Sequence, residues 1–208
     1  MILNVEVAEV MPVNAYFYID DESLHGFLID PGAEPERLLR IIEEKNFAIE
    51  KILLTHGHFD HIGAVNEIQR KLKIPVIMYE NGKNYAKNSS WNLSRFTLGI
   101  DLELDDVTFL SDKSLITLQN NFDFNVKLIH TPGHTTDGAI YYSEKDKVAF
   151  VGDTIFKSSF GRTDFPGGDF QTLMNTIKTK IFTLPEDTKL FTGHGEFTIV
   201  ADEKNLFL

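Results

Sequence analysis

The residues best suited to chemistry lie in one short segment, residues 53–63, which reads "LLTHGHFDHIG". The chain has seven histidines, and His56, His58 and His61 fall within a six-residue span that also holds Asp60. Imidazole nitrogens and carboxylate oxygens are ligands for divalent transition metals. Where a strand ends, positions i and i+2 point the same way, so His56 and His58 are predicted to share one ion. Asp60 and His61 follow as the chain turns into a helix, and their different direction predicts a second ion beside the first.

Three further segments place a polar side chain just after an apolar, strand-like run. They contain His134 in "KLIHTPGHTTDG", Asp153 in "KVAFVGDT" and His194 in "KLFTGHGE". Rigid strand ends commonly carry functional groups. Taken alone, each histidine has an ordinary alternative as a hydrogen-bonded structural residue, and Asp153 has one as a turn residue. Together with residues 56–61, they predict one metal centre built from five imidazoles and two carboxylates.

Two sheets are expected to position these residues. Apolar runs between turn signals predict strands, and apolar residues at helical spacing predict helices. The predicted strands cover residues 2–10, 15–20, 24–29, 51–55, 75–79, 114–118, 125–130, 138–142, 148–151 and 189–193. Helices are predicted over residues 36–46, after Asp60 and over residues 170–181, whereas residues 81–106 carry no clear pattern. Blocks of strands interrupted by helices indicate two sheets with helices packed outside them.

Length and composition favour one soluble domain over residues 1–208. The formal net charge is −11, and an acidic surface repels phosphate backbones, which disfavours nucleic acid as a partner. The chain has no cysteine, so a metal must be held by nitrogen and oxygen. The first twenty residues lack a basic start, and no window approaches the roughly 18 apolar residues of a membrane span. We therefore expect a cytoplasmic protein without a membrane partner; the oligomeric state is not indicated.

The motifs "THGHFDHIG", "TPGHT", "GDT" and "GHG" follow one another in the chain order of the metallo-β-lactamase superfamily, which this sequence resembles over essentially its whole length. The resemblance implies an α+β fold, the four-layer αβ/βα sandwich with two mixed β-sheets flanked by helices. Within that superfamily, "GRTDFPGGD", "KIFTLPEDT" and the closing "GHGEFTIVADEKNLF" resemble the short, single-domain glyoxalase II-like branch, whose members are similar to hydroxyacylglutathione hydrolase.

The resemblance also implies a role for each candidate residue. His56, His58 and His134 would hold a first metal, Asp60, His61 and His194 a second, Asp153 would bridge the two, and Asp30 in "LIDPG" would orient the ligands. The cofactors implied are two divalent ions, with zinc expected and iron or manganese also compatible. Full-length glyoxalase II enzymes have a further C-terminal helical region that binds glutathione, and this chain ends fourteen residues after His194. The resemblance therefore indicates the reaction type more than the thiol carrier.

The reaction expected is hydrolysis of a small-molecule thioester, such as a 2-hydroxyacyl-glutathione, by a hydroxide that bridges the two metals. Asp60 would accept the proton as the hydroxide forms. Arg162, in the "GRTDF" loop, is expected to grip a substrate carboxylate. The alternative is an internal ion pair of Arg162 with Asp164 or Asp169.

Other activities of the same superfamily remain open. A mononuclear iron persulfide dioxygenase shares the "GRTDF" and "IFTLP" runs, and the metal count per chain would separate it from a hydrolase. Another hydrolase of this fold, similar to a lactonase or a β-lactamase, is a further alternative. A purely structural metal module is disfavoured, because structural zinc sites are usually single and closed by four ligands.

Overall fold

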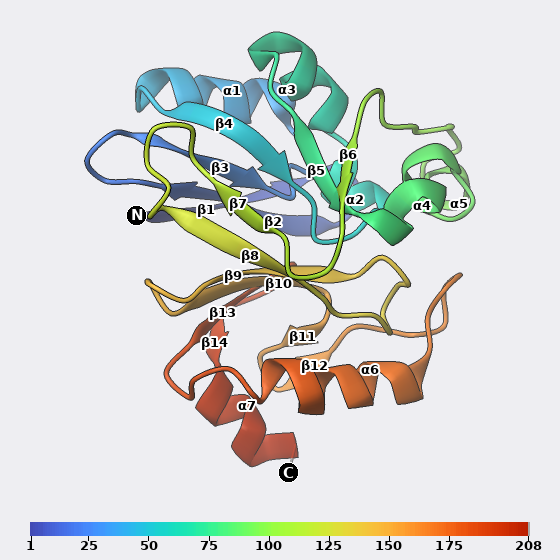
Figure 1. Ribbon diagram of the computed structural model, residues 1–208. Helices are drawn as coiled ribbons and strands as arrows, with labels where there is room; N and C mark the ends of the chain where they lie inside the picture. The colour runs from blue at the N-terminus through green and yellow to red at the C-terminus, as the bar shows by residue number, and fades with distance from the viewer. Residues whose placement is uncertain (208) are drawn as a thin grey trace.

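The computed structural model, which describes residues 1–207, has four layers. Two six-stranded sheets lie face to face, with helices α1 and α3 outside the first sheet and α6 and α7 outside the second (Figure 1). The four-layer αβ/βα sandwich predicted from the sequence is therefore confirmed. No helix within residues 1–207 is long and apolar enough to cross a membrane.

The first sheet is mixed. Its strands are, in spatial and chain order, β1 (Ile2–Ala8), β2 (Pro12–Ile19), β3 (His25–Ile29), β4 (Ala48–Leu53), β5 (Val76–Tyr79) and β6 (Thr108–Leu110). The β1–β2 and β2–β3 pairs are antiparallel. From β3 onward the neighbours are parallel, so the carboxyl ends of β3 and β4 lie at the same edge.

The second sheet is also mixed. Its spatial order is β14 (Thr198–Ile199), β13 (Lys189–Thr192), β10 (Val148–Gly152), β9 (Ala139–Ser143), β8 (Asn125–His130) and β7 (Leu115–Thr117). Only the β10–β13 pair among these neighbours is parallel, which brings the carboxyl ends of these two strands together. A short hairpin of β11 (Ile155–Phe156) and β12 (Ser159–Phe160) follows β10.

The helices cover the sheets or connect their strands. They are α1 (Pro35–Glu44), α2 (Phe59–Ile62), α3 (Val65–Leu72), the 3₁₀ turn η1 (Glu80–Gly82), α4 (Lys83–Lys87), α5 (Ser94–Thr97), α6 (Phe170–Thr176), the π-helical segment η2 (Ile177–Ile181) and α7 (Val200–Phe207). The helices predicted over 36–46 and 170–181 are confirmed, although the last five residues of the second one take the wider π form. Helices α4, α5 and α7 and strands β6, β11, β12 and β14 were not predicted.

Alternating side chains fill three apolar layers. Along β2, Tyr16 and Tyr18 pack between the two sheets, whereas Phe17 and Ile19 point to the core under α1 and α3. Because successive residues of a strand face opposite sides, a strand buried on both faces is apolar along most of its length. Strand β10 repeats the pattern: Phe150 lies between the sheets, and its neighbours pack against α6 and α7. These layers hold the strand ends rigidly in place.

Candidate metal centre

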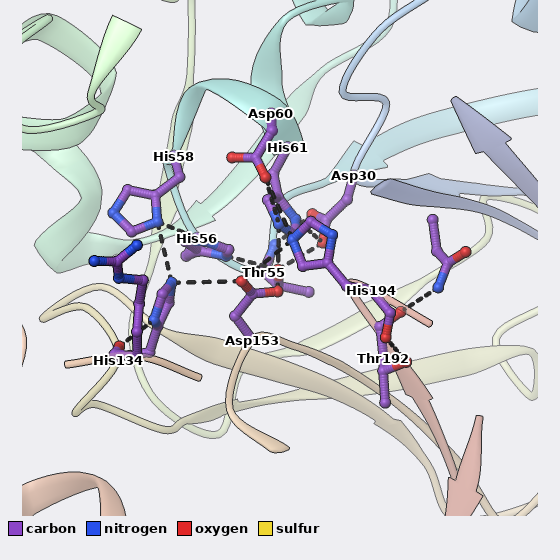
Figure 2. Close-up of polar contacts among 12 residues, drawn as sticks. Asp30, Thr55, His56, His58, Asp60, His61, His134, Asp153, Thr192 and His194 are labelled. Carbon is purple, nitrogen blue, oxygen red and sulfur yellow. Dashed lines mark hydrogen bonds and ion pairs between the residues drawn. The ribbon is translucent and has the colours of Figure 1, made fainter. Parts of the chain in front are cut away.

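The predicted ligands come together from four separate strand ends. His56 and His58 follow β4, with Asp60 and His61 on the short helix α2 just beyond them. The other three ligands follow strands of the second sheet: His134 follows β8, Asp153 follows β10 and His194 follows β13. Asp30 directly follows β3. The site thus lies where the two sheets present their strand ends to each other, and Figure 2 shows the side chains converging there.

The first ligand cluster contains three histidines, all buried. Nδ1 of His58 lies 3.1 Å from Nε2 of His56 and 3.0 Å from Nε2 of His134. Nitrogens bound to one zinc ion at about 2.0–2.1 Å lie roughly 3.4 Å apart in a tetrahedral site. The three nitrogens are therefore spaced to share one ion.

The second ligand cluster contains Asp60, His61 and His194. Oδ2 of Asp60 lies 3.3 Å from Nε2 of His194 and 3.8 Å from Nε2 of His61. In Figure 2 this cluster lies on the opposite side of Asp153 from the first one.

Asp153 contacts both clusters. Its Oδ2 lies 3.6 Å from Nε2 of His134 in the first cluster and 3.4 Å from Nε2 of His194 in the second. Its Oδ1 lies 3.4 Å from Nε2 of His61. This is the position of a carboxylate that can bridge two ions.

The unpartnered atoms of the site fit a bound cation. Nε2 of His61 and Oδ1 of Asp153 are buried and have no hydrogen-bond partner within the described chain. Buried polar atoms without partners are costly unless water or an ion satisfies them. The donors are nitrogen and oxygen only, a set that suits zinc, iron or manganese.

In four of the five histidines, Nε2 faces the centre and the other ring nitrogen, Nδ1, makes a hydrogen bond. His61 donates from Nδ1 to Asp30 at 3.0 Å, and Thr55 Oγ1 accepts from Nδ1 of His56 at 3.2 Å while donating to Asp30. The two main-chain acceptors are the carbonyl of Arg162 for Nδ1 of His134 and the carbonyl of Pro12 for Nδ1 of His194, both at 2.6 Å. Such contacts fix the tautomer and the ring orientation of a metal ligand.

Electrostatics prepare the first cluster for a cation. Burial and the neighbouring His134 lower the pKa of His58 to about 3. Burial, with His61 and His58 nearby, also lowers the pKa of His56 well below its ordinary value. Both rings are therefore neutral at physiological pH and present nitrogen lone pairs.

Carboxylates dominate the second cluster. Burial alone would lower the pKa of His194, yet hydrogen bonds to Asp153 and Asp60 raise it to about 10. Burial alone would likewise lower the pKa of His61, but the charges of Asp153, Asp60 and Asp30 raise it well above its ordinary value. This half of the site thus concentrates negative charge, and bound cations would take the place of the protons on the two imidazoles.

Two backbone features allow the side chains of the site to lie this close together. Asp30 has a left-handed backbone with φ of 48°, a conformation that aspartate tolerates better than most residues. At Gly193, a Cβ atom would lie 2.2 Å from Oδ1 of Asp153 and 2.7 Å from Cε1 of His61. Only glycine fits there, because any side chain would occupy the space of the ligands.

Arg162 lies in the wall of the cleft that opens on the ligands. Its guanidinium donates from Nε and from one terminal nitrogen to Asp164, at 2.7 and 2.6 Å, and stacks over the Phe165 ring at 3.9 Å. The ion pair considered from the sequence is therefore present with Asp164. Asp169 instead caps α6 by accepting the Thr172 N–H. Substrate binding by Arg162 stays a prediction.

Sequence reasoning missed several residues of the site. Thr55, which precedes the first ligand, links His56 to Asp30. Asp137 is fully buried, and neither carboxylate oxygen has a hydrogen-bond partner within residues 1–207. Burial raises its pKa to about 7. The signal that could have identified Asp137 is a charged residue placed two positions before the apolar run of β9.

Comparison with known proteins gives the family. A model of the metallo-beta-lactamase superfamily matches residues 8–194. The hydroxyacylglutathione hydrolase GloC of Haemophilus influenzae is 36% identical over 202 residues, 94% of each chain. The crystal structure of BLEG-1 B3 metallo-beta-lactamase matches with a TM-score of 0.92 at 32% identity, covering 99% of this chain and 97% of that one. That of TTHA1623 in a di-iron-bound form has a TM-score of 0.86 at 30% identity, covering 98% of both chains.

The chain belongs to the metallo-β-lactamase superfamily. It is a metallo-hydrolase of that superfamily, with a cluster of histidines and aspartates suited to divalent metal ions.

Proposed function

We propose that this protein hydrolyses thioesters at a centre of two divalent metal ions. The observation that carries the proposal is the pair of adjacent ligand clusters, with Asp153 between them and an open cleft beside them. A structural zinc site would instead be single and closed by four protein ligands. The similarity to a protein named hydroxyacylglutathione hydrolase supports a thioester as the substrate. The similarity to a protein solved with two irons supports a dinuclear centre.

Each ligand set has a defined part in the proposed reaction. Two divalent ions, when bound, would lower the pKa of a water from 15.7 toward about 7 and polarise the acyl oxygen. His56, His58 and His134 would hold one ion, Asp60, His61 and His194 the other, and Asp153 both. Asp60 lines the cleft and is the proposed acceptor of the proton that the attacking water gives up.

The proposed leaving group is a thiolate, which does not have to be protonated by the protein before it departs. A C–O bond forms to the acyl carbon as the C–S bond breaks, the products are a carboxylic acid and a thiol, and the proton held by Asp60 returns to the thiolate or to solvent. A thiolate leaves readily, so no strong general acid is needed in the cleft. A strongly basic leaving group would require one.

The test is release of free thiol from a panel of thioesters by metal-loaded protein. We expect activity that chelation removes and that zinc, iron or manganese restores. The variant His58→Ala is expected to be inactive. The matched control is His25→Ala, whose imidazole pairs with Glu50 at the other end of β3. Oxygen consumption with a persulfide, by protein holding one iron per chain, would favour the dioxygenase instead.

A further inference from the structure

The cleft beside the ligands, about 410 Å³ in volume, has mostly apolar walls. Its apolar residues come from segments far apart in the chain and are Met11, Phe59, Leu93, Phe156, Phe160 and Phe165. Binding sites for small molecules commonly combine apolar walls of this kind with a few polar groups that orient the ligand. The parts of a substrate away from the reacting carbonyl therefore meet hydrocarbon surface.

One phenylalanine ring of the cleft lies beside a histidine of each ligand cluster. The centroid of Phe165 lies 5.9 Å from that of His58 in the first cluster. The centroid of Phe156 lies 5.9 Å from that of His194 in the second cluster. A thioester whose carbonyl lies between the two clusters would extend its acyl and thiol arms along these two rings.

The charge of Arg162 is already balanced. Within residues 1–207, Arg162 supplies the one lysine or arginine side chain that lines the cleft. It donates two hydrogen bonds to Asp164, and that pairing lowers the pKa of the Asp164 carboxyl to about 2. A free carboxylate of a substrate would have to compete with Asp164 for the guanidinium and would meet the negative charge of that carboxylate.

We infer that the substrate is a thioester with an apolar acyl group on an uncharged thiol, in preference to a conjugate of an anionic thiol such as glutathione. This inference rests on the proposed function and adds the class of substrate to it. Burying apolar arms against Phe156 and Phe165 supplies binding that a charged, hydrated arm cannot supply there.

The test compares four thioesters made from two acyl groups and two thiols. The acyl groups are hexanoyl and lactoyl, and the thiols are N-acetylcysteamine, which is uncharged, and glutathione. We expect the kcat/KM of hexanoyl-N-acetylcysteamine to exceed that of lactoylglutathione by about tenfold or more, as burial of some 50–60 Å² of additional apolar surface implies. Replacing lactoyl by hexanoyl and replacing glutathione by N-acetylcysteamine are each expected to raise kcat/KM.

Asp164→Asn tests the role of the ion pair. Releasing Arg162 is expected to raise kcat/KM for the two glutathione thioesters about two- to fivefold, the range that corresponds to an exposed ion pair, and to leave the N-acetylcysteamine esters unchanged. The matched control is Asp187→Asn, which breaks the equally exposed pair with Lys147 at the opposite end of β10 from Asp153. The control is expected to change none of the four rates.

The outcomes separate this inference from the function on which it rests. If the protein hydrolyses lactoylglutathione as well as or better than hexanoyl-N-acetylcysteamine, the inference is wrong and thioester hydrolysis stands. The same conclusion follows if either single change, of acyl group or of thiol, fails to raise kcat/KM in wild-type protein. If none of the four esters releases thiol with metal-loaded protein, the proposed function itself fails.

Discussion

Asp30 links a histidine of each ligand cluster. It contacts His61 of the second cluster directly and His56 of the first cluster through Thr55. Its Oδ2 lies 3.0 Å from Nδ1 of His61, and its Oδ1 accepts the Thr55 N–H at 2.8 Å. Thr55 in turn accepts a hydrogen bond from Nδ1 of His56. One buried carboxylate thus orients a ligand of each cluster, although it is not itself placed to bind a metal.

Asp30→Asn should therefore weaken metal binding without removing a ligand. An amide has only one oxygen, so it cannot accept the Thr55 N–H at the position of Oδ1 and also the bonds from Thr55 Oγ1 and His61 at the position of Oδ2. We therefore expect a loss of about 10- to 100-fold in affinity for the second metal. Competition with a chromogenic chelator measures this loss. Asp187→Asn, far from the site, serves as the control, and an unchanged affinity in Asp30→Asn would show that Asp30 has no orienting role.

The two clusters predict the metal content of variants. Because each cluster has its own three ligands, His58→Ala and His194→Ala are each expected to reduce the content from two metal ions per chain to one. Elemental analysis of protein dialysed after metal loading measures the content, with His25→Ala as the control. A wild-type content of one ion per chain would contradict the dinuclear site.

Asp60→Asn tests proton transfer. An amide oxygen can still face the second metal but cannot take up a proton at neutral pH, so we expect kcat to fall about 100-fold or more. The measurement is the rate of thiol release at saturating metal, with the metal content determined on the same sample. A variant with two ions per chain and wild-type kcat would remove Asp60 from the mechanism.

Asp137 predicts a pH dependence of stability. Burial raises the pKa of this carboxyl to about 7 in the folded chain, above its ordinary value of 3.8. Folding therefore favours the protonated form, so the contribution of Asp137 is complete below pH 3.8 and is lost as pH rises toward 7. The loss is about 1.4 kcal/mol for each pH unit between these values.

Asp137→Asn should remove this dependence, because an amide does not ionise in that range. We expect the variant and the wild type to have similar free energies of unfolding at pH 4 and the variant to be more stable at pH 7.5, as measured by urea denaturation. The pH 4 measurement is the internal control. A difference between the two proteins that does not grow with pH would mean that Asp137 stays ionised in the folded chain.

The residue types and their local spacing were enough to predict which side chains converge at the candidate metal centre. Metal binding selects for imidazole and carboxylate, and the i, i+2 relation of His56 and His58 at a strand end is a property of the backbone alone. Apolar runs likewise predicted most strands, since a strand buried on both faces, such as β10, is apolar along nearly all of its length.

Only the tertiary structure decided how these residues meet their surroundings. Arg162 pairs with Asp164, and its own carbonyl orients His134, a contact between residues 28 positions apart. The burial of Asp137 and the apolar walls of the cleft also depend on packing between segments distant in sequence. Local periodicity specifies which face of an element is apolar but not which element covers it, so these contacts follow from the assembled sheets alone.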